Sequence, residues 1–238
     1  MFGSLIITNT MKKIFYPLVF VFTAIIAGCT GRIQTENKID CNVDPDEYFG
    51  QSYQAQDFQF WRVLAVGETY ANIIDSIKYK LGERADEDAY TQSGSRLVPV
   101  SDTAAFGEVL RQMTLKFADE MPGHYCWLKD EFTGDYCELL FLYGEAEGRP
   151  LIDGSHIDSA CVVEWRGQMS VDFVFDKEGT EMFRKLTAET VGERLAMTLG
   201  ERVLSTPMVN GEINGGKCSV SASDTEKACA IAAVLNKK

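Results

Sequence analysis

A short strand followed at once by an amphipathic helix constrains the fold of this 238-residue chain more than any other feature. From Val171 to Phe175, alternate residues are apolar, which is the period-two pattern of a strand that buries one face. Glu178-Gly179 follows, and the next apolar residues recur at helical spacing: Met182, Phe183, Leu186 and Thr190. The sequence therefore predicts a sheet whose apolar face is covered by a helix.

Two further elements follow in this C-terminal region. The apolar runs Arg194 to Leu199 and Arg202 to Val209 flank Gly200-Glu201, which predicts a hairpin with Pro207 near a strand end. Ser223 and Glu226 form the pattern of a capping box. That box opens a last helix with four inward positions: Ala228, Ile231, Ala232 and Leu235. We predict the α+β class, a small mixed or antiparallel sheet with helices packed on one face.

Taken together, these segments resemble the head subdomain of the first periplasmic domain of SecD and SecDF, membrane proteins that assist the late stage of protein export. The resemblance covers roughly residues 139–236. It rests on a collinear set of segments: Leu139 to Tyr143, Arg149 to Ala160, Val171 to Phe175, Glu178 to Ala196, Val203 to Val209 and Ile213 to Gly216.

The resemblance implies a fold and a passive role. Six matching positions are expected to determine the fold, and none is expected to be catalytic: Gly179, Phe183, Gly192, Ala196, Pro207 and Gly216. The export proteins couple proton flow to motion through transmembrane helices, and we expect no such helix in the mature chain. Any role in export is then holding, docking or regulating.

The N-terminus predicts a signal peptide. Two lysines precede an apolar run from Ile14 to Ile26, whose length of about thirteen residues suits a signal-peptide core and is too short to span a membrane. The run ends in Ile26-Ala27-Gly28-Cys29, which resembles a bacterial lipobox, in which Cys29 is acylated and becomes the first mature residue. An ordinary secretory signal with a chance cysteine is the alternative. Translation can start at Met1 or at Met11.

Acylation of Cys29 predicts a tethered protein whose first partner is the bilayer, because two or three acyl chains anchor a protein firmly. In enterobacteria an aspartate after this cysteine favours the inner membrane, so Thr30 favours the outer membrane. We predict a membrane-anchored lipoprotein on the periplasmic side.

The charge of the mature chain excludes one class of partner. Loss of residues 1–28 removes two lysines and takes Lys+Arg from 23 to 21 against 35 Asp+Glu, a net charge of −14. Nucleic-acid binding needs a basic surface, so no nucleic-acid partner is expected. A cationic or unfolded polypeptide partner and a merely solvated acidic surface both fit this balance.

Six cysteines follow Cys29: Cys41, Cys126, Cys137, Cys161, Cys218 and Cys229. In an oxidising compartment an even number is compatible with three bridges. We predict a disulfide between Cys126 and Cys137, because they flank a turn-rich tip and closing so short a loop contributes roughly 3 kcal/mol. The connectivity of the other four stays open, and buried reduced thiols are the alternative for Cys161, Cys218 and Cys229.

The chain divides into four predicted parts: a signal peptide (1–28), a polar linker (29–50), an α+β region of unrecognised family (51–123) and the head-like domain (124–238). The third part holds an aromatic strand from Phe58 to Leu64 and two helical stripes. The stripes are Tyr70, Ile73, Ile74, Ile77 and Leu81, and Phe106, Val109, Leu110, Met113 and Phe117. In the export proteins a separate base subdomain carries the head, so this part is a remnant or replacement of that base, or an upstream part of the head.

No catalytic motif occurs in the sequence, and only His124 and His156 can serve as histidine bases or ligands. His156 lies between Asp153 and Asp158 and follows Ser155, which suggests a Ser-His-Asp or metal site. Residues adjacent in sequence seldom form a triad, and this segment resembles a turn that enters a strand, with both aspartates as turn or capping residues. We therefore predict no catalytic, cofactor-binding or metal site, and no enzyme.

Two functions remain. The first is a lipid-anchored module that meets extended or unfolded polypeptide by adding it to an exposed strand edge. The residues expected at that edge are Val171, Phe173, Phe175, Val203 and Ser205. The second is an envelope structural or inhibitory lipoprotein that reuses the fold for one specific protein partner, since a fold does not fix a function.

Overall fold

The computed structural model describes residues 39, 41–82, 89–91, 93–116, 124–129, 134–145 and 148–237. Its helices are α1 (Pro45–Phe49), α2 (Glu68–Leu81), α3 (Thr103–Lys116), α4 (Lys177–Glu189) and α5 (Thr225–Leu235). Its strands are β1 (Phe58–Val63), β2 (Ala89–Tyr90), β3 (Arg96–Pro99), β4 (His124–Lys129), β5 (Tyr136–Tyr143), β6 (Ile152–Asp153), β7 (Ile157–Trp165), β8 (Gln168–Phe175), β9 (Leu195–Leu199), β10 (Arg202–Ser205) and β11 (Lys217–Ala222). The predicted α+β class is confirmed.

The strands form two antiparallel sheets in the described residues. One is a three-stranded sheet in the order β11-β8-β7. The other has eight strands in the order β10-β9-β1-β5-β3-β2, with β4 added to β5 and β6 added to β1, so it is larger than the predicted small sheet. Because β1 lies between β9 and β5, the regions expected at 51–123 and 124–238 share this sheet.

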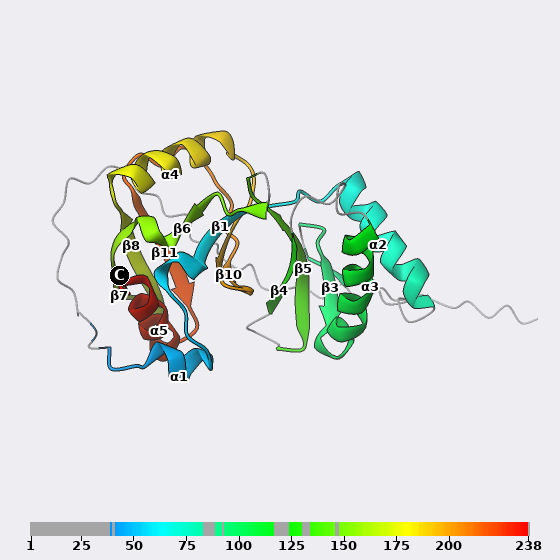
Figure 1. Cartoon of the computed structure of the whole chain (residues 1–238), viewed down its shortest axis with the longest axis horizontal. Coiled ribbons are helices and arrows are strands. Elements are labelled where there is room, and N and C mark those ends of the chain that lie inside the picture. The colour runs from blue at the N-terminus through cyan, green and yellow to red at the C-terminus, as the bar shows by residue number, and fades with distance from the viewer. Residues whose placement is uncertain are drawn as a thin grey trace, which may run out of the picture.

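The molecule has two lobes joined by the eight-stranded sheet (Figure 1). In one lobe α4, α5 and the three-stranded sheet enclose the largest apolar cluster, in which Phe60 contacts Phe173, Phe175 and Phe183. In the other lobe α2 and α3 bury the two predicted helical stripes against β3 and β5. Phe117, the last residue of the second stripe, lies outside the described residues.

The predicted strand and helix of the first lobe are confirmed as β8 and α4. Asp176 caps α4 by accepting a hydrogen bond from the backbone N–H of Gly179 at 2.7 Å. Gly179 sits where a Cβ would lie 2.7 Å from the Cβ of His156, so no side chain fits between helix and turn. Gly216 has φ +61°, a left-handed conformation that glycine adopts without strain. These glycines therefore act as fold determinants, as expected.

The last helix begins one residue later than predicted. Asp224, rather than Ser223, is its N-cap, and its carboxylate accepts a hydrogen bond from the backbone N–H of Lys227 at 2.7 Å. That hydrogen bond holds the pKa of Asp224 below its usual value. Aspartate and serine are equivalent N-caps, so the two adjacent residues could not be ranked from sequence.

The segment before β1 folds against α5. Cys41 forms a disulfide with Cys229 of α5, and Phe49 of α1 is buried in the large apolar cluster. At the far end of α5, Lys237 Nζ pairs with Asp46 Oδ1 at 2.6 Å. Residues 41–50, part of the expected linker, are therefore packed on the fold.

The predicted Cys126–Cys137 disulfide is wrong. Cys126 lies opposite Leu140 in the β4–β5 ladder and Cys137 lies opposite Lys129, so the two cysteines are three positions apart along the strands. At about 3.4 Å per residue that offset is roughly 10 Å, beyond the reach of a disulfide. Both are buried thiols. The short loop suggested a bridge, but the hairpin register separates its ends.

Candidate polypeptide-binding edge

The residues Val171, Phe173 and Phe175 do not form an edge. They belong to β8, which is the central strand of the three-stranded sheet and pairs with β11 on one side and β7 on the other. Their side chains are at most 3% exposed. This part of the predicted binding edge is wrong, because apolar alternation identifies a buried face and carries no information on strand order.

Val203 and Ser205 belong to β10, the terminal strand of the larger sheet in hydrogen-bond order. β4 and β11 are close to β10, but among the described residues neither pairs with it. Val203 packs on a cluster inside the curled sheet that includes Cys126 and Leu140. β10 is therefore an edge strand in hydrogen-bond order, as predicted for Val203 and Ser205, and binding of a partner there stays a prediction.

The three-stranded sheet ends in β11 on one side and in β7, nine residues long, on the other. Asn236, just after α5, makes two hydrogen bonds to Ala160 of this strand. Its Oδ1 accepts from the Ala160 N–H at 3.1 Å, and its Nδ2 donates to the Ala160 carbonyl at 3.0 Å. A neighbouring antiparallel strand would make hydrogen bonds to the same N–H and carbonyl of Ala160. The side-chain amide of Asn236 therefore occupies the position of a strand backbone.

The position of Ala160 fixes the direction of its neighbours. Along an antiparallel strand, the backbone N–H and C=O groups of successive residues point alternately to the two neighbouring strands. Those of Val162 and Glu164 therefore point outward, away from β8, as those of Ala160 do. Val162 is buried through its side chain, and Glu164 is exposed. In the described part of the chain no strand pairs with this side of β7. The edge therefore offers sequence-independent backbone donors and acceptors.

The solvent side of the same sheet is polar. Asp172 of β8 accepts a hydrogen bond from Ser219 of β11 at 2.7 Å between Oδ1 and Oγ. Cys218, the neighbour of Ser219 on β11, lies opposite Phe173 on the other face and packs against the core, where burial raises the pKa of its thiol to about 12. The face therefore presents hydroxyls and a carboxylate, together with the side chains of Val163 and Val174.

The residues around His156 form a turn and a helix cap. Asp153 accepts hydrogen bonds from the backbone N–H of Ser155, at 2.8 Å, and from its hydroxyl. His156 Nδ1 lies 3.7 Å from Asp176 Oδ2, and Asp176 is the N-cap of α4. The predicted turn role of Asp153 is confirmed, and Ser155 is bonded to that aspartate instead of to the histidine.

The second histidine, His124, stacks edge-on against Trp61 with 4.5 Å between ring centroids. Burial lowers its pKa, which favours the neutral ring. Within the described ranges no group of three or more histidine, cysteine, aspartate or glutamate side chains is placed to hold a metal ion.

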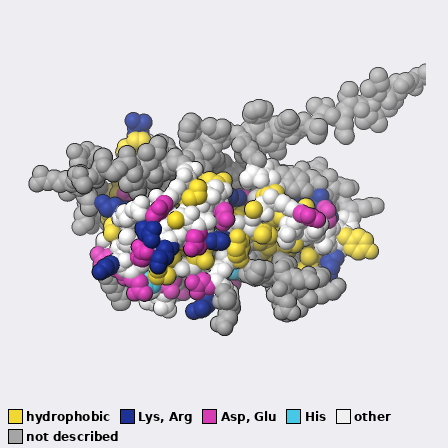
Figure 2. Space-filling model, turned by 90° about the horizontal axis from the view of Figure 1, so that it is seen from above, with side chains coloured by type: hydrophobic (Ala, Val, Ile, Leu, Met, Phe, Trp, Pro, Cys, Tyr) yellow, Lys and Arg dark blue, Asp and Glu magenta, His cyan; other side chains and the backbone are white. Residues whose placement is uncertain are grey.

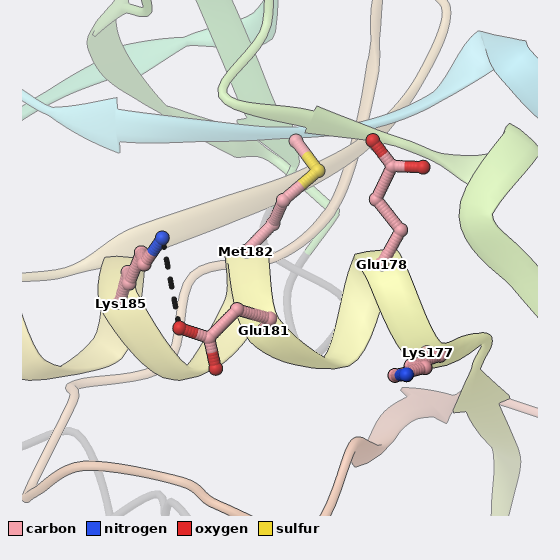
Figure 3. Close-up of a pocket in the computed structure, with 5 residues that line it drawn as sticks. All are labelled: Lys177, Glu178, Glu181, Met182 and Lys185. Carbon is pink, nitrogen blue, oxygen red and sulfur yellow. Dashed lines mark ion pairs between the residues drawn. The ribbon is translucent and has the colours of Figure 1, made fainter.

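A shallow hollow along α4 is lined by Lys177, Glu178, Glu181, Met182 and Lys185. Met182 and Glu178 point to the same side of the helix, and Lys185 pairs with Glu181 at 3.6 Å (Figure 3). All five residues come from one helix, so the hollow lacks the converging walls of a ligand pocket. Figure 2 shows acidic and basic side chains interleaved on this face, without a field of one sign.

Comparison with known proteins shows what this lobe is similar to. Residues 143–237 match the family model described as SecDF, P1 head subdomain. The predicted resemblance is confirmed. The chain is 31% identical over 159 residues to the protein translocase subunit SecD of Calditerrivibrio nitroreducens, which covers 66% of this chain and 26% of that protein. It is 34% identical over 90 residues to the translocase subunit SecDF of Thermus thermophilus, covering 37% of this chain and 12% of that protein.

Solved SecDF structures are also similar to this chain. A SecDF crystal structure in a super-membrane-facing form covers 77% of this chain and 19% of its own, with 23% identity and a TM-score of 0.42. A second, titled as a membrane component that enhances protein export, covers 76% of this chain and 93% of its own, with 19% identity and a TM-score of 0.38. The chain spans about a quarter or less of the curated relatives named above.

The predicted lipidation site, Cys29, lies outside the described residues. None of the helices in the described part of the chain has the length and hydropathy needed to cross a bilayer. Asn236 is a functional candidate that the sequence did not reveal, because an asparagine after a helix is an ordinary C-terminal residue and its contact with Ala160 joins positions 76 residues apart.

Proposed function

We propose that this protein is a lipid-anchored, non-catalytic module of protein export that binds extended polypeptide at the β7 edge. The lipid is carried by Cys29, and the fold lies on the periplasmic side of the membrane. The match of residues 143–237 to the SecDF head subdomain supports the connection with export. The relatives described above are named translocase subunits, and this chain shares only a part of their length.

The contact between Asn236 and Ala160 carries the proposal. A side-chain amide satisfies one outward pair of backbone groups on β7, and exposed strand edges are protected in this way against uncontrolled pairing. The next backbone N–H and C=O groups that point away from β8, those of Val162 and Glu164, continue the same edge. An extended chain can add there through backbone hydrogen bonds, which suits a partner of varied sequence.

The test uses the full chain and a reduced, alkylated polypeptide that cannot fold. Glu164→Pro removes an outward N–H without touching the buried face, and we expect affinity to fall about fivefold for the loss of one hydrogen bond. Glu164→Ala is the matched control, because it removes the same side chain and keeps the N–H. Asn236→Ala frees both groups of Ala160 and should raise affinity.

Equal affinities of Glu164→Pro and Glu164→Ala would rule out the β7 edge. A folded envelope protein recovered in a fixed ratio with the chain, together with no binding of unfolded polypeptide, would instead favour the structural or inhibitory lipoprotein.

The anchor has a separate test. The wild-type chain should incorporate labelled fatty acid in a bacterial host and sediment with membranes, whereas Cys29→Ser should do neither. Membrane sedimentation that is independent of Cys29 would contradict lipid anchoring. The same fractions, separated by density, distinguish the outer membrane from the inner membrane.

A further inference from the structure

The turn between β7 and β8 has an unusual conformation. Arg166 and Gly167 are its two central residues, with φ of +53° and +78°, and Trp165 pairs with Gln168 to close it. Positive φ at both positions is the geometry of a type I′ hairpin turn, which asparagine and glycine normally fill. Arg166 is the only described non-glycine residue with positive φ, and that conformation costs about 1–2 kcal/mol. A residue kept there at a cost points to a role in function.

The side chains of this turn suit a boundary between apolar and aqueous phases. Trp165 is 47% exposed, and the guanidinium of Arg166 lies 4.4 Å from the centre of its ring. A Cβ placed on Gly167 would meet nothing within 4 Å, so the turn projects from the body of the protein. An aromatic ring with a polar edge next to a long cationic side chain is the composition found at the headgroup level of bilayers.

The turn lies at the same end of the lobe as the start of α5. Glu164 pairs with Met169, and Met169 pairs with Ala222 of β11. The chain then passes through Asp224, the N-cap of α5. The hairpin turn and the N-terminus of α5 therefore face the same direction.

The chain also enters the lobe from that end. Asp46 is paired with Lys237 beyond the C-terminus of α5, whereas Cys41 is bonded to Cys229, closer to the helix N-terminus. Followed backwards from α1, the chain thus runs along α5 toward the hairpin turn, and Figure 1 shows α1 beside α5. Cys41 comes twelve positions after Cys29, a reach of at most about 43 Å when fully extended.

From these positions we infer that Trp165 and Arg166 form a second membrane contact, which inserts into the headgroup layer of a phospholipid bilayer and orients the lobe. The inference rests on the proposed lipid anchor at Cys29. The anchor brings the lobe within reach of the bilayer, and the disulfide fixes the end at which the tether leaves. Trp165 then reaches the apolar boundary, while Arg166 meets headgroup phosphates. The acidic remainder of the chain is repelled from anionic lipids, so insertion is confined to this turn.

The test uses the acylated full chain in vesicles of phosphatidylethanolamine and phosphatidylglycerol at three to one, with and without brominated acyl chains that quench tryptophan. Trp165→Phe isolates the signal of Trp165 from those of Trp61 and Trp127. We expect bromolipid quenching in the wild type and its loss in Trp165→Phe. Arg166→Gly keeps the turn geometry and removes the cation, and it should reduce the quenching. Tyr79→Phe, at a side chain 89% exposed on α2, is the control and should leave quenching unchanged.

The outcomes separate the anchor from the turn. Chains that float with vesicles but show the same quenching as Trp165→Phe overturn the membrane contact and leave the anchor intact. Chains that fail to float overturn both the anchor and the contact built on it, while the polypeptide-binding assay still stands. A photocrosslinker at position 166 that attaches in cells to a protein, with no quenching in vesicles, would assign the turn to a protein partner instead.

Discussion

Arg194 and Glu138 form a two-pronged ion pair that joins positions 56 residues apart in the chain. Nη1 lies 2.7 Å from Oε1 and Nη2 lies 3.2 Å from Oε2. Arg194 also donates to the carbonyl and the hydroxyl of Thr206. Glu138 lies on β5, before the residues that match the head subdomain, and Arg194 lies within them. The pair therefore fastens the head-like segment to the preceding lobe.

Arg194→Met should destabilise the protein by about 3 kcal/mol. The side chains of Arg194 and Glu138 are only 19% and 9% exposed, and removing one partner leaves a carboxylate with little water to replace it. Urea unfolding followed by circular dichroism measures the loss. Arg184→Met breaks surface ion pairs with Glu181 and Glu212 and should change stability little. Equal effects of the two variants would contradict a structural role for the buried pair.

The Cys41–Cys229 disulfide should contribute roughly 2–5 kcal/mol, because it closes a loop of 188 residues in the unfolded chain. Cys41→Ser should lower the unfolding midpoint, and reductant should lower that of the wild type to a similar value. Cys161→Ser is the control, since that residue is not part of the disulfide. Peptide mapping checks the connectivity, and a recovered Cys126–Cys137 crosslink would contradict the structure.

Local elements could be predicted from the sequence, because each is set by a periodic pattern within a few residues. The alternation from Val171 to Phe175 and the stripe that holds Phe183 gave a strand and a helix at the observed places. The same patterns could not show that β8 is central, because strand order depends on pairing between distant segments. Cys41 and Cys229 illustrate the same limit, since their separation of 188 residues leaves no local signal.

For the candidate site, the sequence predicted the type of interaction but not its location. Backbone addition at an edge strand is favoured by the fold, but the edge itself depends on which strand ends the sheet. Asn236 could not be found in advance, because its role arises from the packing of α5 against β7. The turn at Arg166 carries an Arg-Gly dipeptide in the sequence, and only the backbone conformation reveals that the arginine has positive φ.

Gly179→Ala should destabilise the protein by about 1–3 kcal/mol, because the added methyl group overpacks the junction between α4 and the turn at His156. The change would also favour the helix, since alanine is the better helix former. A net loss of stability would therefore show that the steric cost of the added methyl group exceeds the gain in helix propensity. Gly211→Ala is the control, because a Cβ there meets nothing within 4 Å. Thermal unfolding compares the two variants, and a stabilised Gly179→Ala protein would contradict the close contact.

Cys126 should make the protein less stable in alkali. Burial raises the pKa of its thiol from the ordinary value of 9.0 to about 12. Below pH 9 both folded and unfolded states hold the proton, so the group has no effect on stability. Between pH 9 and 12 the unfolded state loses the proton first, and the free energy of unfolding falls by at most about 1.4 kcal/mol per pH unit.

Urea titrations from pH 8 to 11 should show this slope reduced in Cys126→Ala, so the two proteins converge in stability as pH rises. Leu140→Val changes the facing residue without a titrating group, and its stability difference from wild type should stay constant. A constant difference for Cys126→Ala as well would show that the thiol ionises no later in the folded protein than in the unfolded chain.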